Sequence, residues 1–168
     1  IRALEGLSAQ VELKGGIVRI DASNLRGGSL FLGGRHGSSV TGTANAIMAA
    51  SLASGITTIE GSACEPEIVD LCEMLLKMGA QITGIGSHRL SIEGVDRLHG
   101  CRHHVIPDRI ETATYAIAAG ITNGEILIKG CQTEHLGAFA NVMQECGIEL
   151  SNQAKSSLLI KVSPNGLN

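Results

Sequence analysis

A loop rich in glycine, serine and threonine contains the first residues that could bind a ligand. It reads Arg35-His36-Gly37-Ser38-Ser39-Val40-Thr41-Gly42-Thr43 and leads into an apolar segment. Backbone N–H groups and the helix dipole at a helix start favour a phosphate or another anion. The guanidinium of Arg35 could add a forked cation. The alternative is a plain capped helix start, and the loop lacks the Gly-Lys-Ser/Thr ending of a P-loop.

A second charged segment, Pro107-Asp108-Arg109-Ile110-Glu111-Thr112, precedes another apolar stretch. Asp108 is a typical N-cap residue, and Glu111 suits the positive end of a helix dipole. Arg109 opposes that dipole, so it requires a nearby carboxylate or an anionic ligand. The segment is therefore open to two interpretations, a capped helix start or part of an anion site.

Other reactive side chains give weaker indications. Glu65-Pro66-Glu67 opens a further helix, and two acids in a first turn are most often structural. Cys64 lies near a helix start, which is only a weak sign of a nucleophile.

A cluster of histidine and cysteine raises the possibility of a metal site. It consists of His99, Cys101, His103 and His104. In an extended segment, Cys101 and His103 point to one face and His104 to the other. No second ligand pair at zinc spacing occurs, so we predict a surface or sheet-edge cluster without a metal.

An internal repeat indicates the elements that position these segments. Five residues recur at a constant spacing of 69 residues. They are Thr43, Ala49, Ala50, Gly55 and Gly61, which recur as Thr112, Ala118, Ala119, Gly124 and Gly130. The opening residues resemble the tail of a third copy, because Leu7-Ser8-Ala9-Gln10 parallels Met78-Gly79-Ala80-Gln81.

Hydrophobic periodicity predicts the same order of elements in both copies: helix, strand, helix and two strands. The first copy has helices over 43–54 and 66–78 and strands over 56–60, 80–83 and 89–93. The second has helices over 109–122 and 133–146, with Thr133 as a cap, and strands over 125–129, 148–151 and 157–162. The first helix of each copy is apolar nearly all round, so we expect it to be covered on several sides. The fold class is therefore α/β (α+β), with helices layered on a mixed sheet.

Composition excludes several classes of function. The 168 residues carry a net charge of −3 and 2% aromatic residues, which argues against a nucleic-acid partner. No apolar run is long enough to cross a membrane. Five scattered cysteines without a CxxC pair are typical of reduced thiols, and we expect a cytoplasmic location.

Several segments, taken in order along the chain, resemble one family. They are Ser39-Val40-Thr41-Gly42-Thr43-Ala44-Asn45, Glu65-Pro66-Glu67-Ile68-Val69-Asp70-Leu71, Ile92-Glu93-Gly94-Val95 and Pro107-Asp108-Arg109-Ile110-Glu111-Thr112. From end to end the chain resembles the UDP-N-acetylglucosamine 1-carboxyvinyltransferases, which are relatives of the shikimate-pathway enolpyruvyl transferase. Each segment alone is weakly specific, whereas their order and spacing are specific.

The resemblance implies an inside-out α/β barrel of two lobes, each built from three βαβαββ units. About two and a half units would be present. Residues 1–106 would be the later part of one lobe, with a repeat tail over 1–32 and a full repeat over 33–106. Residues 107–168 would be the first repeat of the other lobe.

The resemblance also implies a transferase of peptidoglycan and cell-wall biosynthesis. Enolpyruvate would pass from phosphoenolpyruvate to the 3-hydroxyl of UDP-N-acetylglucosamine, with no metal or organic cofactor. Partners would be these two substrates, without nucleic acid or membrane, although the fragment could self-associate. The family's catalytic Cys or Asp loop would lie before residue 1, so this chain would hold no catalytic residue and would be inactive alone.

The family's site residues fall on two groups of positions here. The substrate-binding positions, which contact the nucleotide sugar, are Arg35, Ser38, Ser39, Val40 and Thr41. The cleft and hinge positions are Glu65, Glu67, Asp108, Arg109 and Glu111. The family has a lysine where Gly37 stands, and Arg35 could supply that cation instead.

Two other functions are compatible with parts of the sequence. One is a non-catalytic α/β repeat module that binds an anionic ligand or a protein partner. The other is a cyclase of RNA terminal phosphates, which would need a basic groove and a histidine motif that the sequence lacks.

Overall fold

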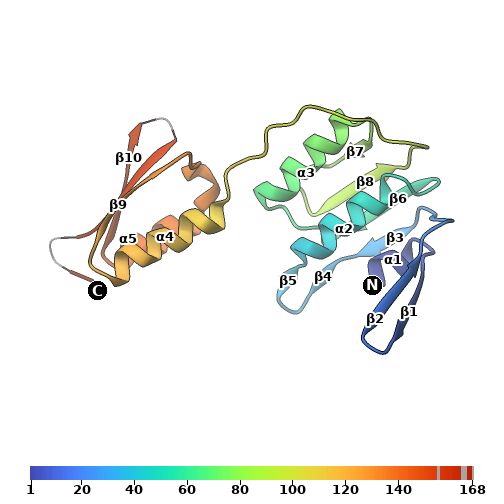
Figure 1. Cartoon of the computed structure of the whole chain (residues 1–168), viewed down its shortest axis with the longest axis horizontal. Coiled ribbons are helices and arrows are strands. Elements are labelled where there is room, and N and C mark those ends of the chain that lie inside the picture. The colour runs from blue at the N-terminus through green and yellow to red at the C-terminus, as the bar shows by residue number, and fades with distance from the viewer. Residues whose placement is uncertain (155, 164–165, 168) are drawn as a thin grey trace. The chain divides into compact units, whose positions relative to one another are not determined.

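The computed structural model describes residues 1–154, 156–163 and 166–167 and consists of two compact units. Unit 1 spans Ile1–Val105 and unit 2 spans Ile106–Asn168 (Figure 1). Each unit has its own hydrophobic core.

Unit 1 opens with a short helix and a hairpin. The helix is α1 (Arg2–Gly6), and the antiparallel hairpin joins β1 (Gln10–Lys14) to β2 (Ile17–Asp21). The turn between the strands is Gly15-Gly16, with φ values of 57° and 77°. Glycine adopts this left-handed backbone without a steric penalty, so the chain can reverse within two residues.

The main part of unit 1 is a four-stranded sheet in the order β3-β6-β8-β7. Its strands are β3 (Ser29–Phe31), β6 (Ile56–Glu60), β7 (Gln81–Thr83) and β8 (Arg89–Glu93). β3 runs parallel to β6, and the other pairs are antiparallel. Alternate residues of β6 and β8 are buried, as expected for a sheet covered on one face.

Two helices cover the buried face of that sheet. They are α2 (Val40–Ala50) and α3 (Pro66–Lys77), which pack against one another (Figure 1). The core they form is aliphatic, with Ile47, Ile59, Cys72 and Ile92 fully buried. α3 begins with a proline at its first turn and ends near Gly79, as the sequence predicts.

Unit 2 repeats this plan with a smaller sheet (Figure 1). It consists of α4 (Arg109–Ile121), β9 (Glu125–Lys129), the 3₁₀-helix η1 (Thr133–Leu136), α5 (Ala138–Glu145), β10 (Ile148–Ala154) and β11 (Ser157–Val162). The strand order is β10-β11-β9, and both pairs are antiparallel. The core of unit 2 includes Leu136 and Met143, against which the partly buried Phe139 and Ala140 pack.

Equivalent hydrogen bonds confirm the repeat. The Ala80 N–H donates to the Leu75 carbonyl at 2.9 Å, and the Ala9 N–H donates to the Leu4 carbonyl at the same distance. His99 N–H likewise bonds the Met78 carbonyl at 3.0 Å, as Arg26 N–H bonds the Leu7 carbonyl at 2.9 Å. The opening residues therefore have the helix–strand–strand order of a repeat tail.

Two predicted helix boundaries are wrong. The helix expected over 133–146 is interrupted at Gly137, whose φ of 49° and ψ of −129° no helix allows, and the N-cap position is Gln132, so Thr133 is the first residue of the 3₁₀-helix and not its cap. The helix expected over 43–54 runs instead over Val40–Ala50, because Leu52 and Ala53 bond to carbonyls three residues back and tighten the chain into turns.

The expectation that α2 and α4 are each covered on several sides is met by α2 and not by α4. α2 contacts α1, α3 and β8. On α4, the side chains of Ile110, Tyr115, Ile117 and Ile121 are 44–74% exposed, because within unit 2 this helix packs mainly on β9, β11 and η1. Among the described residues, no helix is long and apolar enough to cross a membrane.

A close backbone approach at Gly94 gives a test of unit 1. A Cβ at this position would lie 1.6 Å from the Ala53 carbonyl oxygen, and the Gly94 N–H already bonds the Gly55 carbonyl at 3.0 Å. We expect Gly94→Ala to destabilise the protein by at least about 3 kcal/mol, because the backbone must move. The measurement is the free energy of unfolding in urea.

Gly100→Ala is the matched control, because a Cβ there would meet no atom within 4 Å. It should change the free energy of unfolding by less than about 0.5 kcal/mol. If the two variants had the same free energy of unfolding, Gly94 could not lie as close to the Ala53 carbonyl as the structure places it.

Candidate functional site

The predicted anion loop is a small hairpin followed by a capped helix. β4 (Gly33–Gly34) pairs with β5 (Gly37–Ser38), and Arg35 and His36 form the exposed turn between them. Ser39 follows at once as the N-cap of α2. Its Oγ accepts from the Gly42 N–H at 3.1 Å, which satisfies one of the unpaired donors of the first turn.

The residues around this cap are small for a local steric reason. A Cβ on Gly42 would lie 2.7 Å from the Ser39 Oγ, so a side chain there would displace the cap. Val40 is half-buried in the first turn, whereas Thr41 is exposed. The loop is therefore both fixed in position and open to solvent at Arg35, Ser39 and Thr41.

A buried hydrogen bond ties this loop to the start of α3. After β6 the chain turns at Gly61, whose φ is 66°, and the Ala63 N–H then donates to the Thr43 Oγ1 at 3.0 Å. Thr43 is fully buried in the second turn of α2. This contact brings the loop from Arg35 to Thr43, called the Ser39 loop from here on, and Glu65 to the same end of unit 1.

Glu65 carries an unusual buried group at this end. It is the N-cap of α3, but its side chain makes no cap hydrogen bond. Its Oε2 is buried without a hydrogen-bond partner among the described residues. A buried carboxylate oxygen left without a donor costs free energy, which suits a site whose donor comes from a ligand. Glu67, two residues further on in the first turn of α3, does have an interaction partner.

Cys64 is not an activated nucleophile. Its Sγ lies 3.4 Å from the His88 Nδ1, but that nitrogen is also 2.9 Å from the Ser62 carbonyl oxygen. A carbonyl only accepts, so Nδ1 carries a proton and cannot take one from the thiol. Burial, and then the neighbouring Glu65 carboxylate, raises the pKa of Cys64 above its ordinary value. The thiol therefore stays protonated at neutral pH.

In unit 2, the charged segment that begins at Asp108 provides the N-cap of α4. The Asp108 Oδ1 accepts from the N–H groups of Ile110 at 2.7 Å and Glu111 at 3.3 Å. Asp108 thus occupies the place in unit 2 that Ser39 occupies in unit 1, 69 residues earlier. Arg109 is half-buried and has an interaction partner, and Glu111 is exposed. The interpretation of Asp108 as a helix cap is confirmed.

The histidine and cysteine cluster lies along α3. Cys101 Sγ is 3.8 Å from the Met74 carbonyl oxygen, and His103 Nε2 is 2.9 Å from the Asp70 Oδ1, while His104 is exposed. The prediction that Cys101 and His103 share a face is confirmed. In the part of the chain that the structure describes, no three His, Cys, Asp or Glu side chains come together as metal ligands would.

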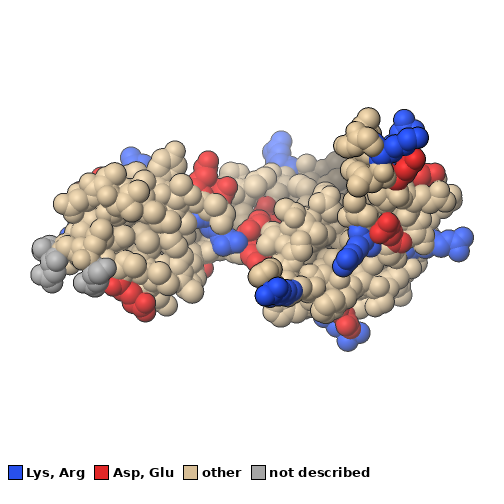
Figure 2. All heavy atoms as spheres, turned by 90° about the horizontal axis from the view of Figure 1, so that it is seen from below, with Lys and Arg blue, Asp and Glu red and all other residues tan. Residues whose placement is uncertain are grey.

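On the face shown in Figure 2, the charged side chains of the described residues do not gather into a patch of one sign. On the face in Figure 2, acidic and basic residues are interspersed among wide uncharged areas. This mixture matches the net charge of −3. This face therefore lacks the basic patch that binding of a polyanion such as RNA requires.

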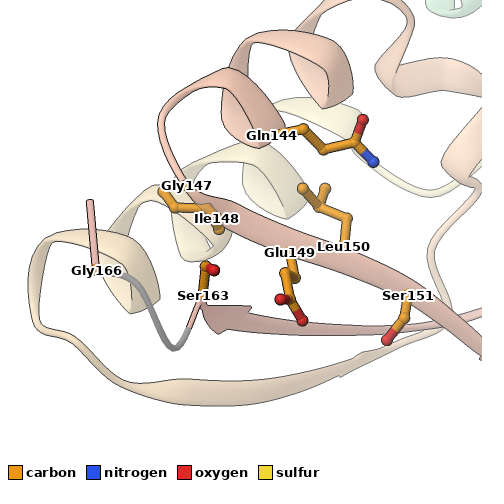
Figure 3. Close-up of a pocket in the computed structure, with 8 residues that line it drawn as sticks. All are labelled: Gln144, Gly147, Ile148, Glu149, Leu150, Ser151, Ser163 and Gly166. Atoms are coloured by element: carbon orange, nitrogen blue, oxygen red, sulfur yellow. The ribbon is translucent and has the colours of Figure 1, made fainter. Parts of the chain in front are cut away.

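A hollow that sequence reasoning did not indicate lies in unit 2 (Figure 3). It has a volume of about 440 Å³. Its lining comes from Gln144, from Gly147 to Ser151 at the outer edge of β10, and from Ser163 and Gly166. The charged side chain among these, Glu149, forms an ion pair with Lys161 at 3.1 Å. The hollow therefore offers backbone and neutral polar groups and little chemistry.

Solved structures similar to this chain define its class. An enolpyruvyl transferase, NikO from Streptomyces tendae, matches with a TM-score of 0.78 and 18% identity, over 96% of this chain and 41% of that one. EPSP synthase from Acinetobacter baumannii matches with a TM-score of 0.63 and 20% identity, over 96% of this chain and 38% of that one. The fold is that of the enolpyruvyl transferases, and the expected βαβαββ architecture is confirmed.

The family follows from the sequence. The model of the EPSP synthase (3-phosphoshikimate 1-carboxyvinyltransferase) family matches residues 1–167, and the chain belongs to this family.

Curated relatives narrow the resemblance further. The chain is 43% identical to a protein of Methylacidiphilum infernorum over 99% of its length, and 47% identical to proteins of Granulibacter bethesdensis and Nitrobacter winogradskyi over 100% and 99%. All three are named UDP-N-acetylglucosamine 1-carboxyvinyltransferase, as the sequence resemblance predicts. The chain spans 38–39% of the length of these relatives.

The thiols give a test of the site's geometry. Because the pKa of Cys64 is raised, its thiolate fraction at neutral pH is lower than that of an ordinary thiol. We expect iodoacetamide at pH 7 to label the exposed Cys101 and Cys146 first and Cys64 later, with site-resolved mass spectrometry as the measurement. The buried Cys72, whose pKa burial and Glu73 raise to about 11, should react last.

Glu65→Gln removes a negative charge beside Cys64 and should accelerate its labelling, while Glu73→Gln, a control on the same helix, should not. If Cys64 were the fastest thiol at pH 7, the protonated Nδ1 of His88 and the raised pKa would both be wrong.

Proposed function

We propose that this chain is part of a UDP-N-acetylglucosamine 1-carboxyvinyltransferase. The observation that carries the proposal is the similarity of at least 43% identity to three relatives of that name, over nearly the whole chain. The similarity to NikO and EPSP synthase supports the same general fold. Because the chain spans 38–39% of these relatives, the activity belongs to the whole protein.

The proposed reaction moves an enolpyruvyl group from phosphoenolpyruvate to the 3-hydroxyl of UDP-N-acetylglucosamine. The hydroxyl group loses its proton as its oxygen bonds to C2 of phosphoenolpyruvate, and C3 gains a proton, which gives a tetrahedral intermediate. Loss of that C3 proton and of inorganic phosphate then restores the double bond. The product is the first committed intermediate of peptidoglycan, which supports a role in cell-wall synthesis.

The Ser39 loop is the proposed site for the diphosphate of the nucleotide sugar. Its position at the start of the eleven-residue helix α2 places backbone N–H groups and the positive end of a dipole beside the ligand. Ser38, Val40 and Thr41 would complete the contact. Arg35, at the tip of the β4–β5 hairpin, is the proposed replacement for the family's lysine.

The carboxylates of the helix starts have a separate proposed role. Glu65 would accept a hydrogen bond from a substrate group through its buried, unpartnered Oε2. Glu67, Asp108, Arg109 and Glu111 are the further positions that family resemblance assigns to the substrate cleft and hinge. Asp108 would hold the start of α4 in place while Arg109 meets an anion.

The two units have proposed places in the whole enzyme. Residues 1–106 would be the later part of one lobe, and residues 107–168 the first repeat of the other. A cytoplasmic location is proposed from the substrates and is supported by the five free cysteines.

Titration of the intact protein with UDP-N-acetylglucosamine tests the proposal by thermal shift. We expect stabilisation that grows with ligand concentration, because a ligand that binds the folded state alone raises the melting temperature. Ser39→Trp should abolish the shift by filling the loop, and Arg109→Ala should weaken binding about tenfold.

Arg97→Ala is the control, because it removes one cation from an exposed position outside the proposed site. It should leave the titration unchanged. Absence of any shift in the intact protein would contradict the proposed substrate, and an unaltered shift in Ser39→Trp would contradict the proposed site.

A further inference from the structure

The segment that leaves β8 and ends unit 1 is held to α3 although it forms no helix or strand. The His99 N–H donates to the Met78 carbonyl at 3.0 Å, just beyond the end of α3. The Cys101 Sγ then lies 3.8 Å from the Met74 carbonyl oxygen. These contacts hold the segment alongside α3 as far as His103.

His103 connects to two charged side chains of α3. Its Nε2 is 2.9 Å from the Asp70 Oδ1, and its Nδ1 is 3.0 Å from the Lys77 Nζ. The side chains of His103 and Asp70 are 5% and 11% exposed, so this contact is largely shielded from water. Shielding makes each hydrogen bond stronger than a surface contact, and makes an unpaired group costly.

The donors and acceptors fix the protonation of the imidazole. A lysine ammonium only donates, so the Nδ1 of His103 must accept with a lone pair. The single proton of the neutral ring is therefore on Nε2, where it donates to the Asp70 carboxylate. An imidazolium would have no acceptor for Lys77 and would place two cations 3.0 Å apart.

The spacing on α3 allows both contacts at once. Asp70 and Lys77 are seven residues apart, which is close to two turns, so they lie on the same face of the helix. Together they hold His103 from both sides. Asp70 is the acidic residue of the Glu65–Leu71 segment that no ligand role accounts for.

We propose that Asp70, His103 and Lys77 form a latch that holds the connecting segment on α3. The latch works with the neutral Nε2–H form of His103. It fixes the chain up to two residues before the end of unit 1 at Val105, and so sets the point at which the connection to unit 2 begins. This proposal does not depend on the identity of the substrate.

Trypsin provides the test, because the exposed Arg102 lies inside the latched segment. A protease needs a locally released chain, so the rate of cleavage after Arg102 reports how often the latch opens. In the intact protein we expect His103→Phe and Asp70→Ala to raise this rate about tenfold or more, as the loss of a hydrogen bond to a charged group implies. Lys77→Met should raise it less, because the bond to Asp70 remains.

Two further variants separate the latch from general loosening. His104→Phe changes the exposed neighbour and should leave the rate unchanged. His103→Gln retains a donor for Asp70 and should restore much of the protection. Hydrogen exchange of the β6 and β8 amides should be the same in all variants, because their core does not involve His103.

The unmodified protein provides a second measurement that needs no variant. Imidazole ¹⁵N chemical shifts at neutral pH should identify His103 as neutral with its proton on Nε2. An Nδ1–H form or an imidazolium would overturn the proposal, as would unchanged cleavage after Arg102 in both His103→Phe and Asp70→Ala.

Discussion

The buried hydrogen bond from the Ala63 N–H to the Thr43 hydroxyl is the contact that ties the starts of α2 and α3 together. It joins the second turn of α2 to the segment that enters α3, so two helix starts lie at one end of one sheet. The packing of α2 on α3 supports the same arrangement. With these contacts, a neutral cap, a glycine-rich hairpin and an unpartnered carboxylate oxygen occupy one region.

Local pattern was sufficient to predict most of the secondary structure. The strands over Ile56–Glu60, Arg89–Glu93, Glu125–Lys129 and Ser157–Val162 have the bounds that alternation predicts, because their buried and exposed residues alternate. α3 was predictable from its proline and its following glycine. Prediction failed at Gly137, where a glycine inside a helical pattern takes a backbone conformation that no local pattern indicates, and at the exposed face of α4.

The site was predictable only where it is contiguous in sequence. The caps Ser39 and Asp108 act on N–H groups two or three residues ahead, so residue type and position indicate them. Contacts between distant segments left no such signal. His88 is 24 residues from Cys64, and His103 is 33 residues from Asp70, and neither pairing has a local pattern.

The two equivalent caps, Ser39 and Asp108, differ in charge, and this difference has an electrostatic consequence for the two helices. A serine hydroxyl carries no charge, so it fixes the start of α2 without neutralising the positive end of that helix. An aspartate at the same place in the second copy compensates the partial positive charge of α4 from within the chain. The positive end of α2 thus stays uncompensated by its cap, whereas the cap of α4 offsets the equivalent partial charge in the second copy.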